Sequence, residues 1–470
     1  MKQVLQNPSG TVIREVPPPP CPAGNVLVRN EFSVISSGTE RAFVEGTQKS
    51  IAARVRERPE LALKVVDKAR REGLRRTREL VRSNLSEETA TGYSSAGVVV
   101  EVGSAVRGIS VGDRVACAGA GYASHAEIVS VPSNLCAKVP HGVPMESAAL
   151  TTIAAIALHG IRLADVRLGE RVAVVGCGLV GQIAARLLAA AGTEVFALDL
   201  DPAKVDAAVA AGSHHGIPVG PDSGSAVRHA TTGIGVDVVV VTAATDTSDP
   251  LVLAAEIARD RGAVVLVGDV PIDVPRALFY EKELSFRVSR SYGPGRYDSD
   301  YEERGLDYPI GYVRWTERRN MESVLELQAR GQLILRDLID DVMPIERADE
   351  AYARLAGPPE LMPDGIPQLS VDEAIAGADV VMMLRVQRER LEEDLGDAPG
   401  EFLSRYGLTS ERLASAAAGA VVMHPGPMNR GVEIDPLIAD DPERSLITLQ
   451  VEVGVGVRMA CLEMLLGNDA

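Results

Sequence analysis

Paired cysteines are missing from this 470-residue sequence, although it contains five cysteines. None of the five stands in a CxxC pair, so the sequence indicates neither a disulfide framework nor a structural zinc knuckle. The five are Cys21, Cys117, Cys136, Cys177 and Cys461. The sequence also contains fewer basic than acidic residues, and its formal net charge is −17. This balance argues against nucleic acid as a partner.

Long apolar runs are scarce as well. No segment is long and apolar enough to span a bilayer, and the N-terminus shows no basic, apolar leader. We therefore expect a soluble, cytoplasmic protein with no membrane partner. The hydrophobic share of 46% is nevertheless ample for sizeable cores, and the length predicts two or three domains.

One segment near the middle of the chain carries the strongest signal. The apolar run Val172–Val175 opens into Gly176-x-Gly178-x-x-Gly181. A helical pattern rich in alanine and leucine follows, and a second apolar run ends in Asp199. This order of strand, glycine turn, helix, strand and acid predicts a dinucleotide-binding βαβ unit.

Each glycine of this fingerprint has a physical role. Gly176 permits the tight turn, Gly178 lets the backbone approach a pyrophosphate, and Gly181 lets helix and strand pack closely. The helix start, at Leu179 and Val180, presents free N–H groups and a positive dipole end to the phosphates.

Asp199 sets the expected cofactor. Its carboxylate can accept hydrogen bonds from a ribose 2′-hydroxyl and would repel a 2′-phosphate, so we expect NAD rather than NADP. The alternative interpretation is an ordinary βαβ unit whose glycines serve only packing.

Short β-branched runs between Gly, Pro and Asp turns predict a β-rich region over residues 1–47 and 87–150. The segment between them, Lys49 to Arg82, carries twelve basic residues against five acidic ones and is predicted as two helices. It is either a solvated hairpin or dimer surface, or an electropositive rim that attracts an anionic substrate.

Strands and helices alternate from Ala149 to about Phe286. The segments 236–242 and 262–268 are nearly continuous apolar runs, as strands of a buried parallel sheet require. Ligands bind at the carboxyl edge of such sheets. We therefore predict backbone contacts to the nicotinamide ribose and carboxamide at the ends of these strands, from Thr242, Ala243, Gly268 and Asp269.

Several motifs of residues 1–355 together resemble the medium-chain (zinc-type) dehydrogenase/reductase family, and most closely the dehydrogenase half of bacterial bi-domain oxidoreductases. The matching segments, besides the glycine fingerprint, are Gly97–Gly103, Val111–Val115, Ser37–Glu40, Ser291–Tyr297 and Asp307–Thr316. The resemblance implies an α/β fold: a GroES-like β-rich catalytic domain and a Rossmann doubly wound parallel sheet. It also implies NAD as cofactor and a homo-oligomer, either a dimer or a tetramer.

The resemblance further implies domain boundaries. Residues 1–158 form the catalytic domain, with the basic insertion at 48–86, and residues 159–290 form the NAD-binding domain. Residues 291–356 return to the catalytic domain.

The zinc ligands of the family are replaced in this sequence. Zinc-dependent relatives carry Cys at the position of Ser37, His at that of Tyr93, and Cys or Glu near Thr152. Zinc prefers thiolate, imidazole or carboxylate ligands. We therefore expect no catalytic metal.

Without a metal, other groups must stabilise charge on the reacting oxygen. Thr39 matches the proton-relay hydroxyl of the family, and Tyr93 faces the same pocket as a general acid or base. Glu40 orients this loop in the same interpretation. Alternatively, Thr39 and Tyr93 line the pocket without taking part in chemistry. We interpret His125 and His159 as structural histidines.

Residues 357–470 resemble another family, the aspartate carbamoyltransferases. The matching segments are Gly357–Pro363, Ala378–Arg390, Arg405–Thr409, His424–Ile434 and the region 450–460. By this resemblance Arg385 and Gln387 hold aspartate, which suits a guanidinium facing a dicarboxylate. The turn Pro425-Gly-Pro427 offers backbone carbonyls to the carbamoyl amine. The resemblance therefore implies a partial α/β aspartate-binding domain.

Half of a carbamoyltransferase site is missing from the sequence. We find no Ser-x-Arg-Thr-type phosphate motif upstream, so we do not expect carbamoyl transfer from this chain alone. Three interpretations of the segment remain open. It is a relic of gene rearrangement or an assembly artefact, a docking or oligomerisation element, or a part that completes a site with a separate carbamoyltransferase subunit.

The sequence thus predicts a NAD-dependent, zinc-independent oxidoreductase that moves hydride between nicotinamide and an alcohol or carbonyl substrate. A sugar or nucleotide sugar is the substrate that the resemblance suggests. One alternative is a quinone- or enone-type reductase. The other is a carbamoyltransferase-related, aspartate-binding assembly protein of the pyrimidine pathway.

Overall fold

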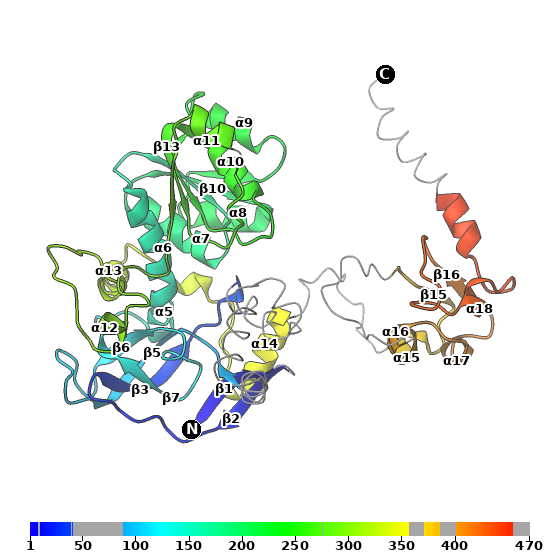
Figure 1. Ribbon diagram of the computed structural model, residues 1–470, viewed down its shortest axis with the longest axis horizontal. Helices are drawn as coiled ribbons and strands as arrows, with labels where there is room; N and C mark the ends of the chain where they lie inside the picture. Colours follow the sequence, from blue (N-terminus) through cyan, green and yellow to red (C-terminus); the bar gives the residue numbers. More distant parts are fainter. Residues whose placement is uncertain are drawn as a thin grey trace, which may run out of the picture. The chain divides into compact units, whose positions relative to one another are not determined.

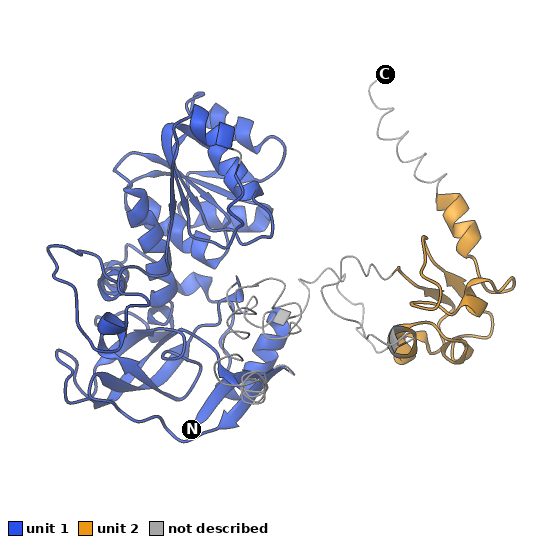
Figure 2. Ribbon diagram, in the orientation of Figure 1, with its two compact units in different colours: residues 1–48, 78–357 blue, residues 49–77, 358–470 orange. Residues whose placement is uncertain are grey.

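The structure is a computed structural model. It describes residues 1–7, 10–38, 40, 88–274, 276–356, 371–385 and 401–454. The predicted basic insertion, Thr39 and Gln387 lie outside these residues. The described residues fall into two compact units, which Figure 2 colours separately. Unit 1 contains the described residues up to 356, and unit 2 those from 371 to 454.

The β-rich part of unit 1 contains two antiparallel sheets, drawn in blue and cyan in Figure 1. The smaller sheet has the order β2-β1-β4 and the larger the order β7-β3-β5-β6-β8. Their strands are β1 (Lys2–Asn7), β2 (Gly10–Glu15), β3 (Asn25–Ser33), β4 (Thr89–Ala90), β5 (Ser94–Val102), β6 (Arg114–Ala118), β7 (Ile128–Pro132) and β8 (Cys136–Lys138). Alternate residues such as Val26 and Val28 are fully buried in one core with Val115 and Val131.

The second part of unit 1 is a six-stranded parallel sheet with the order β11-β10-β9-β12-β13-β14. Its strands are β9 (Arg171–Val175), β10 (Glu194–Asp199), β11 (His215–Pro218), β12 (Val236–Val241), β13 (Ala258–Leu266) and β14 (Ser285–Val288). Sequence order reverses beside β9, where β10 lies on one side and β12 on the other. Such a switch point opens a crevice at the carboxyl edge of a sheet.

Both faces of this sheet are buried, since side chains alternate along each strand. Val172 and Val174 pack with helix residues such as Ile183 on one face. Ala173 and Val175 pack with Leu251 on the other. The helices of this part are α6 (Thr151–Ala164), α7 (Leu179–Ala190), α8 (Pro202–Ala210), α9 (Ser223–Ala230), α10 (Asp249–Ile257) and α11 (Arg276–Glu281).

The return segment of unit 1 packs back on the β-rich part. Tyr292, Met321 and Leu325 are buried in the core of the larger antiparallel sheet, and Tyr352 is buried with Val4 of β1. The helices here are α12 (Ser299–Glu302), α13 (Glu317–Ala329) and α14 (Ala348–Ala356). α5 (Met145–Ala148) precedes α6.

Unit 2 has a core of its own, in which Val381, Leu408 and Val422 are buried. Two parallel strands form its described sheet, and Val381 pairs with Val422. Its elements are α15 (Val371–Ile375), β15 (Val380–Met382), α16 (Glu401–Tyr406), α17 (Ser410–Ala414), β16 (Val421–Met423) and α18 (Pro436–Ala439). Among the described residues of the chain, no helix is long and apolar enough to cross a membrane.

Candidate functional site

The glycine fingerprint forms the turn between β9 and α7. Gly176 has a φ of +98°, a left-handed conformation that favours glycine. A Cβ added there would lie 2.6 Å from the Ala243 amide nitrogen, and one added at Gly181 would overlap the Gly176 carbonyl oxygen. A Cβ at Gly178 would meet no atom within 4 Å. Gly176 and Gly181 therefore serve the turn and its packing, whereas Gly178 borders open space.

Asp199 lies at the end of β10 and holds this turn. One of its carboxylate oxygens accepts a hydrogen bond of 2.6 Å from the Cys177 amide. The other accepts one of 2.9 Å from the Asp201 amide. These two hydrogen bonds, one to each carboxylate oxygen, fix Asp199 beside the turn. The turn leads into the N-terminal end of α7, where anionic groups are favoured.

The carboxyl ends of β9, β12 and β13 meet at the same edge. The Thr242 hydroxyl donates to the Gly176 carbonyl at 2.5 Å, and a Cβ added at Gly268 would overlap the Ala243 carbonyl oxygen. The Asp269 carbonyl accepts the Thr245 amide at 3.0 Å. The structure therefore brings together the strand-end residues that the sequence nominated.

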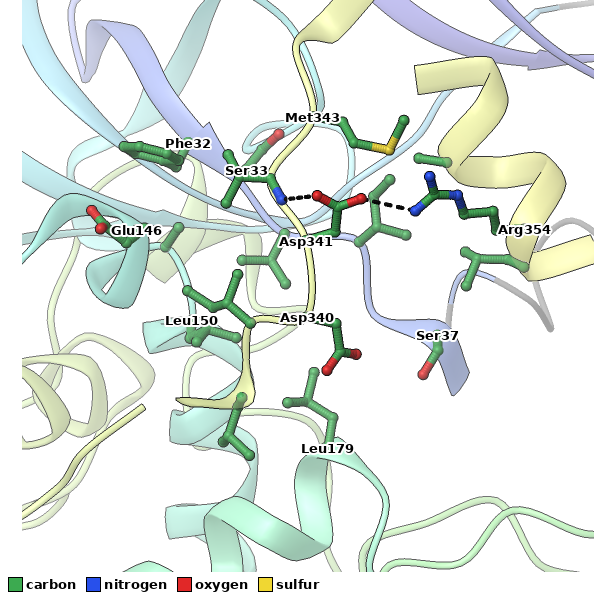
Figure 3. Close-up of a pocket in the computed structure, with 18 of the residues that line it drawn as sticks. Phe32, Ser33, Ser37, Glu146, Leu150, Leu179, Asp340, Asp341, Met343 and Arg354 are labelled. Carbon is green, nitrogen blue, oxygen red and sulfur yellow. Dashed lines mark hydrogen bonds and ion pairs between the residues drawn. The ribbon is translucent and has the colours of Figure 1, made fainter. Parts of the chain in front are cut away.

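A cavity of about 1340 Å³ extends from the glycine turn. Gly178, Leu179 and Lys204 line it from the parallel-sheet part, while Ser33 and Ser37 line it from the β-rich part. Figure 3 shows Leu179 and Ser37 at this cavity with Asp340 and Asp341 of the return segment. Because both parts of unit 1 contribute to its wall, the cavity can hold a cofactor against a second ligand.

Not every predicted residue lines this cavity. The lining set contains Gly178 and Leu179 but none of Thr242, Gly268 or Asp269. Tyr93 is also outside it and packs against the core that contains Leu150 and Ile153.

Lys204 lines the cavity although the sequence interpretation did not nominate it. It lies in the first turn of α8, five residues after Asp199, and its ammonium is 3.7 Å from the Asp201 carboxylate. A lysine that closely follows Asp199 in the sequence is the signal from which Lys204 could have been predicted.

Zinc does not fit the residues at the three family ligand positions. Ser37 and Thr152 offer hydroxyls, and the Thr152 hydroxyl already donates to the Cys117 carbonyl at 3.1 Å. Tyr93 offers a phenol. None of these groups is a thiolate, imidazole or carboxylate, the ligands that zinc takes in proteins. Among the described residues, no group of three or more His, Cys, Asp or Glu side chains could hold a metal ion.

Glu40 is buried behind the cavity wall, with 3% of its surface exposed. One carboxylate oxygen accepts a 2.8 Å hydrogen bond from the Tyr352 hydroxyl, and the other lies 3.6 Å from His125 Nε2. Burial, followed by the charge of Glu40, raises the pKa of Tyr352. On the other side of the ring, His125 Nδ1 lies 2.7 Å from the Ser33 hydroxyl. The sequence interpretation did not nominate Ser33.

Unit 2 carries the residues nominated in the carbamoyltransferase-like segment. Arg385 follows β15, and the turn with Pro425 and Pro427 follows β16, the neighbouring parallel strand. The Met383 amide donates to the Met423 carbonyl at 3.0 Å. Arg385 and this turn therefore follow the same edge of the two-stranded sheet.

Three family models match separate parts of the chain. Residues 72–141 match the alcohol dehydrogenase GroES-like domain, and residues 180–305 match the zinc-binding dehydrogenase model. Residues 365–465 match the Asp/Orn binding domain of aspartate/ornithine carbamoyltransferase.

Solved dehydrogenase structures share the fold of unit 1. Galactitol-1-phosphate dehydrogenase from Escherichia coli has a TM-score of 0.59 at 18% identity, over 77% of this chain and 98% of that one. A short chain alcohol dehydrogenase from Escherichia coli CFT073, complexed with NADH, has a TM-score of 0.57 at 18% identity. This match covers 75% of this chain and 94% of the other.

A zinc-binding dehydrogenase from Sinorhizobium meliloti, bound to NADP, has a TM-score of 0.56 at 19% identity. It covers 76% of this chain and 95% of that one. Together with the two dehydrogenase models, these folds define unit 1 as a medium-chain dehydrogenase/reductase domain.

The rest of the chain is similar to aspartate carbamoyltransferase catalytic subunits. That of Novosphingobium aromaticivorans is 55% identical over 121 residues, which are 24% of this chain and 36% of the relative. That of Rhodospirillum rubrum is 52% identical over 126 residues, 26% of this chain and 40% of the relative. The chain thus spans two fifths or less of these relatives. It joins a medium-chain dehydrogenase domain to an aspartate-carbamoyltransferase-like fragment, which confirms the predicted fold class.

Proposed function

We propose that this protein is a NAD-dependent oxidoreductase that transfers hydride between nicotinamide and an alcohol or carbonyl carbon without a catalytic zinc. The observation that carries the proposal is the glycine turn, which Asp199 holds and whose Gly178 lines the cavity. The turn leaves space at Gly178, where a pyrophosphate can approach the backbone at the start of α7.

The acid favours NAD over NADP. Asp199 places a carboxylate beside the turn, 2.6 Å from the Cys177 amide and 2.9 Å from the Asp201 amide. A 2′-phosphate there would meet like charge, whereas a ribose 2′-hydroxyl can donate a hydrogen bond. In this proposal Leu179 and Val180 face the pyrophosphate. Thr242, Ala243, Gly268 and Asp269 offer backbone groups to the nicotinamide half.

The hydroxyl-bearing residues at the zinc positions support a metal-free reaction. A polyol, sugar or nucleotide sugar is the substrate that we propose, in line with the sequence resemblance and with a fold shared with a galactitol-1-phosphate dehydrogenase. A quinone- or enone-type reductase is the competing proposal, since it also needs no metal. Turnover of NADH with a panel of sugars and enones separates the two.

Other expectations stay proposals. We propose a cytoplasmic homo-oligomer, and the domain boundaries at 158, 290 and 356 remain predictions. For unit 2 we propose a binding or assembly role, in which Arg385 meets a dicarboxylate or a carbamoyltransferase subunit is the partner. Because the chain spans so little of the relatives, we do not propose carbamoyl transfer by this chain alone.

The cofactor assignment predicts a specific loss on substitution of Asp199→Ala. The variant loses hydrogen bonds from the acid to the ribose and should bind NADH about tenfold to a hundredfold more weakly. NADPH affinity should fall less or rise, because the like charge is removed. Fluorescence titration with both cofactors measures the change.

Asp206→Ala is the matched control, since Asp206 is an exposed acid on α8. The unfolding temperature of both variants separates a loss of fold from a loss of cofactor contact. Unchanged NADH affinity in a folded Asp199→Ala protein would rule out the ribose assignment.

A further inference from the structure

We propose that Arg290, with Arg296 beside it, binds an anionic group of the substrate, either a phosphate or a carboxylate. The proposal rests on the proposed function, because it names the class of alcohol or carbonyl compound that this oxidoreductase takes. The substrate is then a phosphorylated or carboxylated compound rather than a neutral sugar or an enone.

Arg290 lies at the edge of the parallel sheet to which we assign the nicotinamide half of the cofactor. It follows β14 by two residues, as Gly268 follows β13, and these strands pair in parallel with Leu266 opposite Val288. The Ser289 amide still donates to the Leu266 carbonyl at 2.8 Å. Adjacent strands lie about 4.8 Å apart. The backbone at Arg290 is therefore about one strand away from the end of β13.

The cofactor's own pyrophosphate lies too far away to be this anion. The sheet order β9-β12-β13-β14 puts three strand spacings between the glycine turn and Arg290. At the usual spacing this separation is about 14 Å, which exceeds the reach of one arginine side chain. An anion that meets Arg290 therefore belongs to the substrate.

The Arg290 guanidinium has no acid to neutralise it. Its side chain is exposed and forms no ion pair with a carboxylate in the described part of the chain. Other arginines of this segment are paired. Arg296 pairs with Glu302 at 2.6 Å, and Arg304 pairs with Asp300 at 2.8 Å. Because a guanidinium binds phosphate or carboxylate through paired N–H groups, the free one can take an anionic ligand.

One aromatic ring carries both guanidiniums. Arg290 Cζ lies 4.6 Å from the centroid of the Tyr297 ring, and Arg296 Cζ lies 3.9 Å from it. Such contact holds a guanidinium against the ring and leaves its N–H groups at the edge for a ligand. Arg296 Nε is buried and has no hydrogen-bond partner among the described residues. The pair therefore presents free donors beside a single ring.

The loop between these arginines has an uncommon backbone. Ser291 has a φ of +52° and Tyr297 a φ of +66°, in the left-handed region that residues other than glycine seldom adopt. Such conformations cost free energy and gather at functional sites. Here the loop turns so that Arg290 and Arg296 share one ring.

The carboxyl groups of this segment are either engaged or neutral. Glu302 accepts from Arg296 Nη1 and leaves Nε free. Burial, followed by the charge of Glu302, raises the pKa of Glu317 to about 9, so this group is protonated at pH 7. Asp298 accepts hydrogen bonds from the Tyr308 hydroxyl and the Asp300 amide.

Arg290→Gln tests the assignment in the full-length protein. The panel is a neutral hexitol, its phosphate ester and the corresponding sugar carboxylate. Wild type should prefer one of the two anionic compounds by about tenfold or more in kcat/KM. The variant should lose about tenfold to a hundredfold of this preference, as expected for a hydrogen bond between charged groups. The loss should appear in KM, because the anion binds away from the reacting carbon.

Two further variants separate a bound anion from a general change in charge. Arg290→Lys keeps the positive charge without the paired N–H groups and should recover only part of the preference. Arg304→Gln is the matched control, since it removes an exposed arginine of the same segment that is already paired with Asp300. Its preference should stay within about twofold of wild type.

Titration with inorganic phosphate and with acetate gives a readout that is independent of turnover. Calorimetry should show that wild type binds one of these anions and that Arg290→Gln binds it about tenfold more weakly. Arg304→Gln should bind it as wild type does. The anion that binds also shows whether the substrate group is a phosphate or a carboxylate.

The outcomes distinguish the anion site from the proposed function. A wild-type protein that binds no NADH overturns the proposed function, while the anion titration still tests Arg290. A protein that binds NADH but has equal anion affinity in wild type and Arg290→Gln overturns only the anion site. A wild-type preference for the neutral hexitol, or equal losses in Arg290→Gln and Arg304→Gln, also overturns it.

Discussion

The two parallel sheets of this chain differ in how they are covered. In unit 1, Val174 of β9 and Val240 of β12 are fully buried, and helices pack on both faces. In unit 2, Val381 of β15 is buried, but its neighbours Val380 and Met382 are each 52% exposed. Parallel sheets are stable when both faces are covered. Among the described residues, the parallel sheet of unit 1 is therefore covered on both faces and that of unit 2 on one.

The difference between the two sheets agrees with the share of each group of relatives that this chain covers. Unit 1 has the fold of dehydrogenases nearly in full, with 98% of galactitol-1-phosphate dehydrogenase covered. The fragment covers 36% to 40% of the first carbamoyltransferase relatives cited above. The matched piece includes the strand-end loops with Arg385 and Pro425, and the sequence upstream contains no Ser-x-Arg-Thr-type phosphate motif.

The largest loss of stability is expected from a substitution in the glycine turn of unit 1. Gly181→Ala places a Cβ against the Gly176 carbonyl oxygen, and a backbone atom cannot move without breaking the turn. We expect a loss of more than about 4 kcal/mol of stability. Chemical denaturation followed by circular dichroism measures it.

Gly178→Ala is the matched control for that substitution. Its Cβ meets nothing within 4 Å, and its φ of −68° suits alanine. Stability should change by less than about 1 kcal/mol, while NADH affinity falls because the methyl group occupies the space of the pyrophosphate. Equal stability loss in the two variants would contradict the packing described for the turn.

A second comparison concerns the buried glutamates of the two units. Glu317, at the first position of α13, is fully buried, and neither of its carboxylate oxygens has a hydrogen-bond partner among the residues that the structure describes. Burial, followed by the charge of Glu302, raises its pKa to about 9, against the opposing charge of Arg296. Glu433 of unit 2 is equally buried, but one of its oxygens accepts the Asn429 amide.

Glu317 therefore makes stability depend on pH. Between about pH 4.5 and pH 9 the unfolded chain ionises this group while the folded protein keeps it protonated. The folded state then binds more protons, so stability should fall as pH rises, by about 1 kcal/mol per pH unit. Glu317→Gln should remove this slope and make the protein more stable than wild type at pH 8.

Urea unfolding at pH 5 and pH 8 measures this effect. Glu433→Gln is the comparison in unit 2 and should not stabilise the protein, because its carboxylate already accepts a hydrogen bond. A wild-type slope that persists in Glu317→Gln would show that other groups cause it.

Local patterns predicted much of this fold. The glycine fingerprint predicted the turn, and apolar runs predicted β9 and β12 in their places, because buried parallel strands need continuous apolar sequence. The apolar pattern of the sequence did not indicate where β13 begins. The strand begins at Ala258 and includes Arg259, which pairs with Asp237 on β12 at 2.6 Å. Charged residues hide a strand when a neighbouring strand neutralises them.

The contact between Ser33 and His125 was beyond the reach of sequence patterns. Ser33 and His125 are 92 positions apart. They meet because β3 pairs antiparallel with β7, and His125 lies in the loop that leads into β7. Periodicity predicts which face a residue occupies, but not which distant residue lies beside it.

The smallest effect is expected from removing unit 2. Unit 1 has cores of its own on both faces of its parallel sheet and in its β-rich part. All the residues to which we assign cofactor binding lie before residue 357. A protein deleted for residues 357–470 should therefore bind NADH within about twofold of the full-length chain, a difference under about 0.5 kcal/mol.

Fluorescence titration and NADH turnover measure this affinity, and Asp199→Ala in the shortened protein should show the same loss as in the full chain. Lost NADH binding in a folded, shortened protein would mean that unit 2 contributes to the dehydrogenase site, and the contrast between the two units would fail.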